Sequence, residues 1–247
     1  AEVAGPDGGP RLVFLHGFTQ TRRSWKPIAE HFVAAGHECL VVDMPGHGDS
    51  GHVRADLRRA ADMIATIGGP ATYIGYSLGG RAALHVALLY PHVTERLGVI
   101  GANPGIDSED ERARRREGDD QLIARMEEVG LEAFLAEWVA LPLFGGRPVG
   151  PLEMQDRLTN TVEGLASSLR LAGTGAQGSL WPRLRELNMP VTAMAGALDT
   201  KFAAIAQQIA DTVPRGECVL VPGAAHAAHL DRPAEVIQAI EALLGRP

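Results

Sequence analysis

The sequence predicts an α/β protein in which helices flank a mostly parallel sheet on both faces. Short apolar runs, each typical of a strand buried on both sides, recur along the chain. Segments with helical periodicity separate these runs, and this alternation is typical of parallel strands joined by crossover helices. The 247 residues are enough for one such domain that carries an inserted subdomain.

The individual elements can be placed from these patterns. Strands are expected at residues 12–15, 39–42, 71–74, 97–100, 191–195 and 218–221. Helices are expected at residues 24–35, 53–67, 81–89, 203–213 and 234–244. Residues 1–10 contain three glycines and two prolines and are expected to form a loose lead-in.

The alternation breaks between residues 104 and 182, where no convincing strand is present. Helical stretches occupy residues 109–129, 131–140 and 152–171, and a loop rich in glycine and proline lies at 145–151. Ordinary crossover helices would need a much shorter segment. The sequence therefore predicts an α/β core formed by residues 1–103 and 183–247, with a helical cap at residues 104–182.

Composition excludes several classes of protein. The net charge of −7 argues against nonspecific nucleic-acid binding, and no apolar run approaches the roughly 18 residues of a membrane span. Cys39 and Cys218 lie in strand-like runs and are expected to be core thiols. No secretory signal is visible, so we expect a cytoplasmic protein. We also expect a monomer or a homodimer. No clustered metal ligands or cofactor motif are apparent, and none is expected.

The segment Gly75-Tyr76-Ser77-Leu78-Gly79 carries the most specific chemical signal in the chain. Its Gly-x-Ser-x-Gly pattern is typical of a nucleophile elbow, a strained turn between a strand and a helix that exposes one serine hydroxyl. The expected strand at 71–74 and helix at 81–89 supply that context. The sequence therefore predicts an active site centred on Ser77.

A serine hydroxyl needs a histidine to accept its proton and an acid to orient that histidine. Asp199 follows the expected strand at 191–195, and His226 follows the last expected strand, so we predict these as the partners of Ser77. His229 is the rival histidine, with a surface or helix-start position as its alternative. Asp211 and Asp231 are rival acids, and both lie near helix ends, where capping is the usual role.

An oxyanion hole needs two backbone N–H groups that point to one position beside the nucleophile. One is expected from Leu78, the residue after the serine. The other is expected from Phe18, in the turn that follows the first expected strand. The Phe18 ring has two open interpretations, as part of the pocket lining or as ordinary packing.

Three segments together resemble the α/β-hydrolase superfamily. They are residues 15–18 (Leu-His-Gly-Phe), 43–50 (Asp-Met-Pro-Gly-His-Gly-Asp-Ser) and 75–80 (Gly-Tyr-Ser-Leu-Gly-Gly). The resemblance implies a sheet with an inserted helical cap and a triad in the order Ser, Asp, His. A superfamily does not determine a reaction, because one fold supports many chemistries.

Other segments are similar to one family within it, the 2-succinyl-6-hydroxy-2,4-cyclohexadiene-1-carboxylate synthases of menaquinone biosynthesis. They are Arg81 and residues 103–106, 111–116, 134–138, 142–144 and 199–202. The resemblance runs from about residue 12 to the C-terminus, and its cap residues are the specific part. Ala225 departs from it, because glycine often precedes the catalytic histidine.

This resemblance implies a carbon–oxygen lyase that abstracts a proton and eliminates pyruvate, with Ser77 as the general base. It also implies that three arginines, Arg81, Arg115 and Arg157, hold the carboxylates of a small anionic substrate. Tyr76 and Trp138 match pocket positions of the family.

Elementary chemistry agrees with the assignment of the arginines, since a planar guanidinium suits bidentate carboxylate binding. Within the arginine-rich segment 112–116, most members are expected to pair with neighbouring acids on a solvated helix face. Two alternatives to the lyase remain open: a serine carboxylesterase-like hydrolase with the same triad, and a non-catalytic ligand-binding protein.

Overall fold

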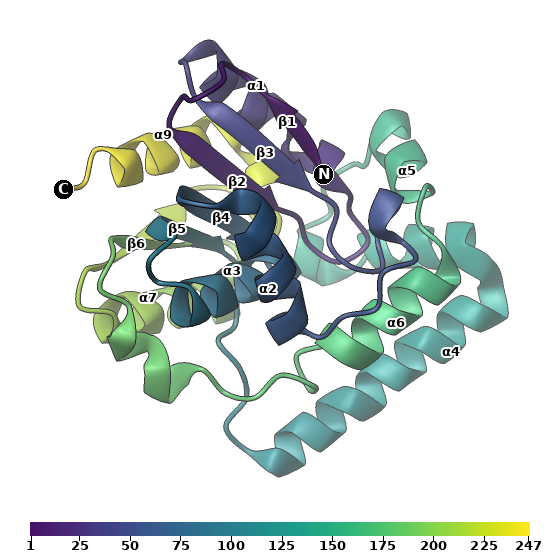
Figure 1. The fold of residues 1–247 in the computed structure, drawn as a ribbon. Coiled ribbons are helices and arrows are strands. Elements are labelled where there is room, and N and C mark those ends of the chain that lie inside the picture. Colours follow the sequence, from purple (N-terminus) through teal and green to yellow (C-terminus); the bar gives the residue numbers. More distant parts are fainter.

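The computed structural model describes residues 1–247, which form a seven-stranded sheet in the order β1-β3-β2-β4-β5-β6-β7 (Figure 1). The strands are β1 (Glu2–Ala4), β2 (Arg11–Leu15), β3 (Glu38–Val42), β4 (Ala71–Tyr76), β5 (Thr94–Ile100), β6 (Val191–Gly196) and β7 (Gly216–Val221). All neighbours run parallel except β1, which pairs antiparallel with β3. The predicted fold class is confirmed.

Strand β1 was not expected, because residues 1–10 carry no apolar run. Its three residues are all exposed, so side-chain burial does not mark it in the sequence. Backbone pairing alone defines it, with Val3 opposite Leu40. The expectation of a loose lead-in is therefore wrong for residues 2–4.

Helices cover both faces of the sheet (Figure 1). They are α1 (Lys26–Ala34), α2 (Leu57–Gly68), α3 (Leu78–Leu89), α4 (Glu109–Val139), α5 (Pro151–Arg157), α6 (Val162–Ala172), α7 (Thr200–Thr212), α8 (Ala228–Asp231) and α9 (Pro233–Leu244). Short 3₁₀ helices are η1 (Arg22–Trp25), η2 (Gly48–Ser50), η3 (Pro142–Phe144) and η4 (Trp181–Glu186). None of these helices combines the length and apolar character that a membrane crossing requires.

The central strand β2 shows why the sheet is covered on two sides. Successive side chains of a strand point to opposite faces. Leu12 and Phe14 pack with α1 and α9, whereas Val13 and Leu15 pack with α2, α3 and α7. All four are fully buried, so the continuous apolar run reflects two separate cores.

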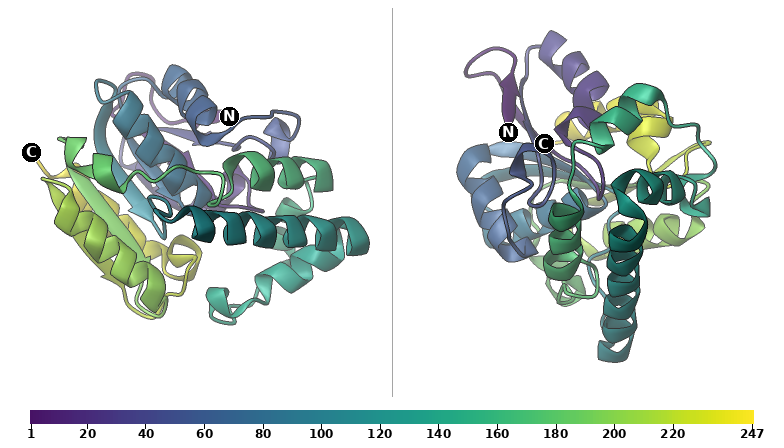
Figure 2. Two further views of the ribbon diagram at one scale, coloured as in Figure 1. Left: turned by 90° about the horizontal axis from the view of Figure 1, so that it is seen from below. Right: turned by 90° about the vertical axis from the view of Figure 1, so that its right-hand side faces the viewer.

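Between β5 and β6 the chain forms only helices, and we call α4, α5 and α6 the cap. In two views α4 and α6 lie side by side along most of the length of α6 (Figure 2). Gly130, with φ 79°, interrupts α4 at the position expected between two helical stretches. The single helix expected at 152–171 is wrong: the chain leaves the helix after α5, and Thr161 caps α6 by accepting a hydrogen bond from Gly164 N at 3.0 Å.

Candidate active site

Ser77 lies in the turn between β4 and α3 and has a left-handed backbone conformation, with φ 50° and ψ −107°. The glycines around it allow this turn to pass close to other backbone. A Cβ at residue 79 would lie 2.1 Å from the Leu15 carbonyl oxygen, and one at residue 75 would lie 2.3 Å from the Gly79 oxygen. Only glycine fits at these two positions without moving the backbone.

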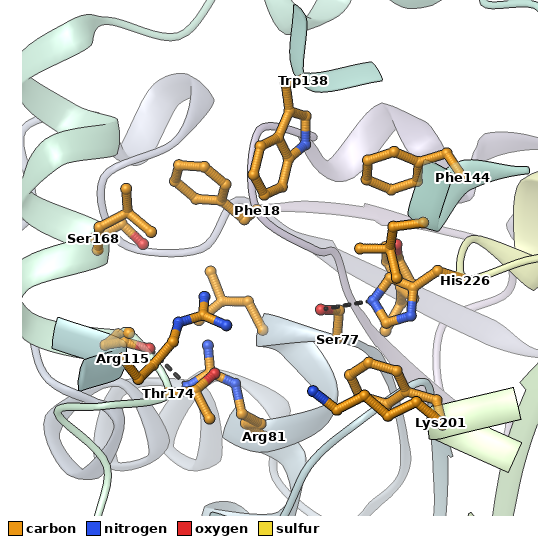
Figure 3. A pocket seen from close by; sticks show the side chains of 17 residues that line it. Phe18, Ser77, Arg81, Arg115, Trp138, Phe144, Ser168, Thr174, Lys201 and His226 are labelled. Carbon is orange, nitrogen blue, oxygen red and sulfur yellow. Dashed lines mark hydrogen bonds between the residues drawn. The ribbon is translucent and has the colours of Figure 1, made fainter. Parts of the chain in front are cut away.

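Ser77, His226 and Asp199 form one hydrogen-bonded relay (Figure 3 shows the serine and the histidine). His226 Nδ1 lies 2.8 Å from Asp199 Oδ2, and His226 Nε2 lies 3.3 Å from Ser77 Oγ. A carboxylate can only accept, so Nδ1 carries the proton and Nε2 presents its lone pair to the serine hydroxyl. Asp199 also accepts from Phe202 N at 3.2 Å, which fixes the carboxylate at the start of α7.

The backbone around the serine offers two N–H donors. Leu78 is the first residue of α3, and the N–H groups of a first helical turn have no partner within their own helix. The positive end of the helix dipole is at the same place. Phe18 lies in a turn closed by a hydrogen bond from Gln20 N to Gly17 O at 3.2 Å, and its own N–H has no acceptor in the protein.

A cavity of about 210 Å³ opens over the serine. The core contributes Tyr76, Ser77, Leu78, Arg81, Lys201, Phe202 and His226, and Phe18 belongs to the turn after β2; the cap and its loops contribute Arg115, Trp138, Leu143, Phe144, Ser168, Leu169, Ala172, Gly173 and Thr174. In Figure 3 the rings of Phe18, Trp138 and Phe144 line the side of the cavity opposite the cations. The rings of Phe18 and Trp138 meet edge to face with centroids 5.2 Å apart.

Arg81 is buried in the cavity wall and forms no ion pair. Its guanidinium donates to Ala172 O at 2.7 Å and to Gln177 Oε1 at 3.2 Å. Burial and the charge of nearby Arg115 lower the pKa of Arg81 to about 10, so it remains a cation at neutral pH. The nearby acid, Asp119, pairs directly with Arg115 and not with Arg81. A buried cation with no ion pair of its own is destabilising, and an anionic ligand would supply a direct partner.

Two further cations border the same cavity. Arg115 donates from Nε to Asp119 Oδ1 at 2.9 Å, and its guanidinium lies beside that of Arg81 (Figure 3). The other Asp119 oxygen is buried without a partner, and burial raises the pKa of this carboxyl. Lys201 belongs to no ion pair and borders the cavity on the same side as the arginines, opposite the aromatic rings (Figure 3). Three cations therefore line the cavity beside the serine.

The structure places Arg157 outside this cavity, whereas the other four predicted substrate-binding residues border it. Its side chain is 4% exposed and donates to Glu153 and to the hydroxyl of Thr19.

The neighbours of Arg115 in the segment 112–116 behave as expected for a solvated helix face. Arg112 and Arg116 both pair with Glu109.

The rival triad residues have other environments. His229 is buried with neither ring nitrogen hydrogen-bonded, and its ring lies 4.4 Å from that of Tyr76. Burial lowers the pKa of His229 well below its ordinary value. Asp231 accepts from Ala225 N at 2.8 Å, and Asp211 pairs with Gln207. None of these three side chains contacts the serine.

Sequence reasoning missed three polar residues of the cavity, Lys201, Ser168 and Thr174. For Lys201 a signal existed, because it follows the catalytic-acid candidate by two residues, at the edge of the sheet where the serine lies. Ser168 and Thr174 carry no such signal. No group of three or more His, Cys, Asp or Glu side chains is arranged to hold a metal ion.

His16 and His47 are buried near the site, and we expect them to make the free energy of unfolding depend on pH under acidic conditions. Burial lowers the pKa of His16 from 6.5 to about 4 and that of His47 from 6.5 to about 3. Below about pH 6.5 the unfolded chain takes up protons at these positions while the folded protein does not. The free energy of unfolding should therefore fall by about 1.4 kcal/mol per pH unit for each histidine as the pH drops toward 4.

Urea unfolding at pH 7, 6 and 5 measures this slope. The variant His47→Gln removes one of the buried titrating histidines and should make the slope shallower. An identical slope in the wild type and in this variant would contradict the assignment.

The sheet, the elbow and the cap together define a class of protein. The model of the alpha/beta hydrolase family matches residues 12–239, so the chain belongs to this family. Within it, the chain is 34% identical to the 2-succinyl-6-hydroxy-2,4-cyclohexadiene-1-carboxylate synthase of Salmonella paratyphi C (strain RKS4594), over 98% of this chain and 96% of that protein. The narrower resemblance inferred from the motifs is confirmed.

Solved structures of other proteins support the same family. The structure of MenH from S. aureus superposes with a TM-score of 0.90 at 30% identity and covers 98% of this chain and 97% of that one. A thermophilic esterase from Thermogutta terrifontis superposes with a TM-score of 0.84 at 24% identity and covers 98% and 91%. The second likeness shows the fold alone.

Proposed function

We propose that the protein is a carbon–oxygen lyase that eliminates pyruvate from a succinyl-enolpyruvyl-cyclohexene carboxylate and forms 2-succinyl-6-hydroxy-2,4-cyclohexadiene-1-carboxylate. The observation that carries this proposal is the buried, unpaired Arg81 in the cavity of the Ser77–His226–Asp199 relay. A hydrolase of neutral esters has no need of a buried cation that makes no ion pair. The full-length similarity to synthases of this product supports the same conclusion.

The relay supplies the base. His226 accepts the Ser77 proton through Nε2, while Asp199 stabilises the imidazolium that forms. The serine oxygen then takes the proton from the ring carbon next to the succinyl ketone. The electron pair of that C–H bond moves through the ring and breaks the carbon–oxygen bond to the enolpyruvyl group, which leaves and becomes pyruvate after protonation.

Charge builds on the ketone oxygen during proton abstraction. Donors placed in advance at the position of such an oxygen are worth about 2.7–4 kcal/mol each. We assign this role to the N–H groups of Phe18 and Leu78, since the first has no internal acceptor and the second begins α3. The oxyanion hole would therefore stabilise an enolate, as it stabilises a tetrahedral intermediate in an esterase.

The cations select the substrate. Arg81 and Arg115 would bind carboxylates at one end of the cavity, and Lys201 supplies a third cation on the same side (Figure 3). Tyr76 and Trp138 would contact the apolar faces of the ring, and burial raises the pKa of the Tyr76 phenol, which keeps it neutral. Cytoplasmic location and a monomeric or homodimeric state stay predictions of the sequence.

The decisive experiment supplies the enolpyruvyl precursor to the purified protein and follows pyruvate through lactate dehydrogenase and NADH. Turnover that depends on Ser77 supports the lyase. Failure to release pyruvate, together with rapid hydrolysis of aryl esters and a trapped acyl group on Ser77, would instead identify a carboxylesterase-like hydrolase.

Two neighbouring arginines offer a matched test of the carboxylate site. Arg115 and Arg116 are similarly exposed, with side chains 44% and 45% accessible, but only Arg115 borders the cavity. Arg115→Ala should lower kcat/KM about 10- to 150-fold, because a hydrogen bond to a charged group contributes about 1.5–3 kcal/mol. Arg81→Ala should have an effect in the same range, and Arg116→Ala should leave kcat/KM unchanged. Equal values for Arg115→Ala and Arg116→Ala would remove support for the carboxylate site.

A further inference from the structure

The turn that carries the Phe18 N–H is strained. We call residues 17–20 the oxyanion turn; it is closed by the hydrogen bond from Gln20 N to Gly17 O. Thr19, directly after Phe18, has φ 66°. This left-handed conformation is unfavourable for a β-branched residue and persists only where the surroundings hold it.

Three hydrogen bonds hold Thr19 in this conformation. Its N–H donates to His47 Nε2 at 3.3 Å, and its carbonyl accepts from Asn160 Nδ2 at 2.9 Å. Its hydroxyl accepts from Arg157 Nη1. Every polar group of the residue is therefore engaged, and Thr19, Asn160 and Arg157 are all buried.

His47 can accept the hydrogen bond from Thr19 N in only one protonation state. Its Nδ1 lies 3.1 Å from Pro45 O, which can only accept, so Nδ1 carries the proton and Nε2 is free to accept from Thr19. Because burial lowers the pKa of His47 to about 3, the ring stays neutral at ordinary pH.

Each nitrogen of the Arg157 guanidinium already donates one hydrogen bond inside the protein. Nε and Nη2 donate to Glu153 Oε1 at 3.3 and 2.8 Å, and Nη1 donates to Thr19. The side chain does not border the cavity over Ser77. To bind a substrate carboxylate in that cavity the side chain would have to move away from Thr19 and Glu153, so direct binding of substrate does not follow from this arrangement.

We infer that Arg157 and Asn160, which belong to the cap, are positioning residues that hold the oxyanion turn in register with Ser77. Arg157 acts through the Thr19 hydroxyl and not on the substrate. The inference rests on the oxyanion hole of the proposed function. Its physical basis is that donors stabilise a developing oxyanion only when they are fixed in advance, and that here the cap fixes one of the two.

A double-mutant cycle tests this assignment. Thr19→Val keeps the size and branching of the side chain but removes the acceptor for Arg157, and Arg157→Met removes the donor. Each variant is measured for kcat, for KM, and for the rate constant of Ser77 inactivation by an uncharged dialkyl fluorophosphonate, whose phosphoryl oxygen occupies the oxyanion hole.

Each single variant should lower kcat and the inactivation rate constant at least about tenfold. This loss is smaller than the 10²–10³-fold loss that follows the complete removal of an oxyanion-hole donor, because here the donor is only displaced. KM should change less than about threefold, and the double variant should be no worse than the more impaired single variant. Thr19→Ser, which keeps the hydroxyl, should regain most of the reactivity. Thr159→Val, the same substitution at an exposed threonine after α5, serves as the control.

Three results for Arg157→Met would together overturn the inference: normal fluorophosphonate reactivity, a KM raised more than tenfold, and an effect additive to that of Thr19→Val. Arg157 would then bind substrate. If Arg157→Met does not fold, the comparison of Thr19→Val with Thr19→Ser decides, and equal reactivities reject the inference. The probe needs only the triad and the oxyanion hole. If the wild type releases no pyruvate while Thr19→Val and Arg157→Met lose probe reactivity, the lyase proposal is disproved and the positioning role is still supported.

Discussion

Replacing Ser77 with alanine is expected to lower kcat for pyruvate release by on the order of 10³-fold or more, because triad members act as a unit. Ser77 Oγ is the only hydroxyl hydrogen-bonded to His226, and the alanine has no oxygen to accept the substrate proton. The substitution removes one atom from a turn whose shape depends on glycines, so the fold should persist. Steady-state pyruvate release measures the effect.

The control is Ser167→Ala, which changes a serine of α6 that does not border the cavity. It should retain wild-type turnover, and both variants should unfold at temperatures close to that of the wild type. Pyruvate release near the wild-type rate in Ser77→Ala would exclude Ser77 from the mechanism.

Asp199→Asn is expected to lower kcat by roughly 10³- to 10⁴-fold, as in other Ser-His-Asp triads. An amide nitrogen would donate to His226 Nδ1, which would move the imidazole proton to Nε2. The ring could then no longer accept the proton of Ser77, from which Nε2 lies 3.3 Å. The amide oxygen can still accept from Phe202 N, so the start of α7 should be preserved.

The matched control for this variant is Asp211→Asn, at the exposed rival acid that pairs only with Gln207. It should leave kcat unchanged. If Asp199→Asn retained kcat within tenfold of the wild type, the carboxylate would not control the tautomer of His226, and the proton relay would have to be assigned differently.

The sequence predicted those parts of the fold that leave a local pattern. Strands β2 to β7 appear as apolar runs, and the interruption of α4 at Gly130 agrees with the two expected helical stretches. Strand β1 was missed because an exposed three-residue strand has no apolar pattern and exists only through its pairing with β3. The break after α5 was missed because the apolar pattern continues across it, although Thr161 is a typical capping residue.

The same distinction applies to the site. Ser77, Asp199 and His226 could be proposed because each follows a strand, and parallel strands bring their carboxyl ends to one edge of the sheet. The role of Arg115 could be proposed only by resemblance, since four arginines lie within residues 112–116. In the structure Arg112 and Arg116 pair with Glu109, whereas Arg115 pairs with Asp119 and borders the cavity.

By itself, the sequence determined the class of fold and the strained serine turn, and it predicted the three side chains that the structure joins by hydrogen bonds, because backbone periodicity and glycine requirements are local properties. Only the tertiary structure decided where the charged side chains lie. Arg157 meets Thr19, which lies 138 residues away in the chain, and Arg81 remains without an acid. A long flexible side chain goes to whichever acceptor folding brings near it, and no sequence pattern records that choice.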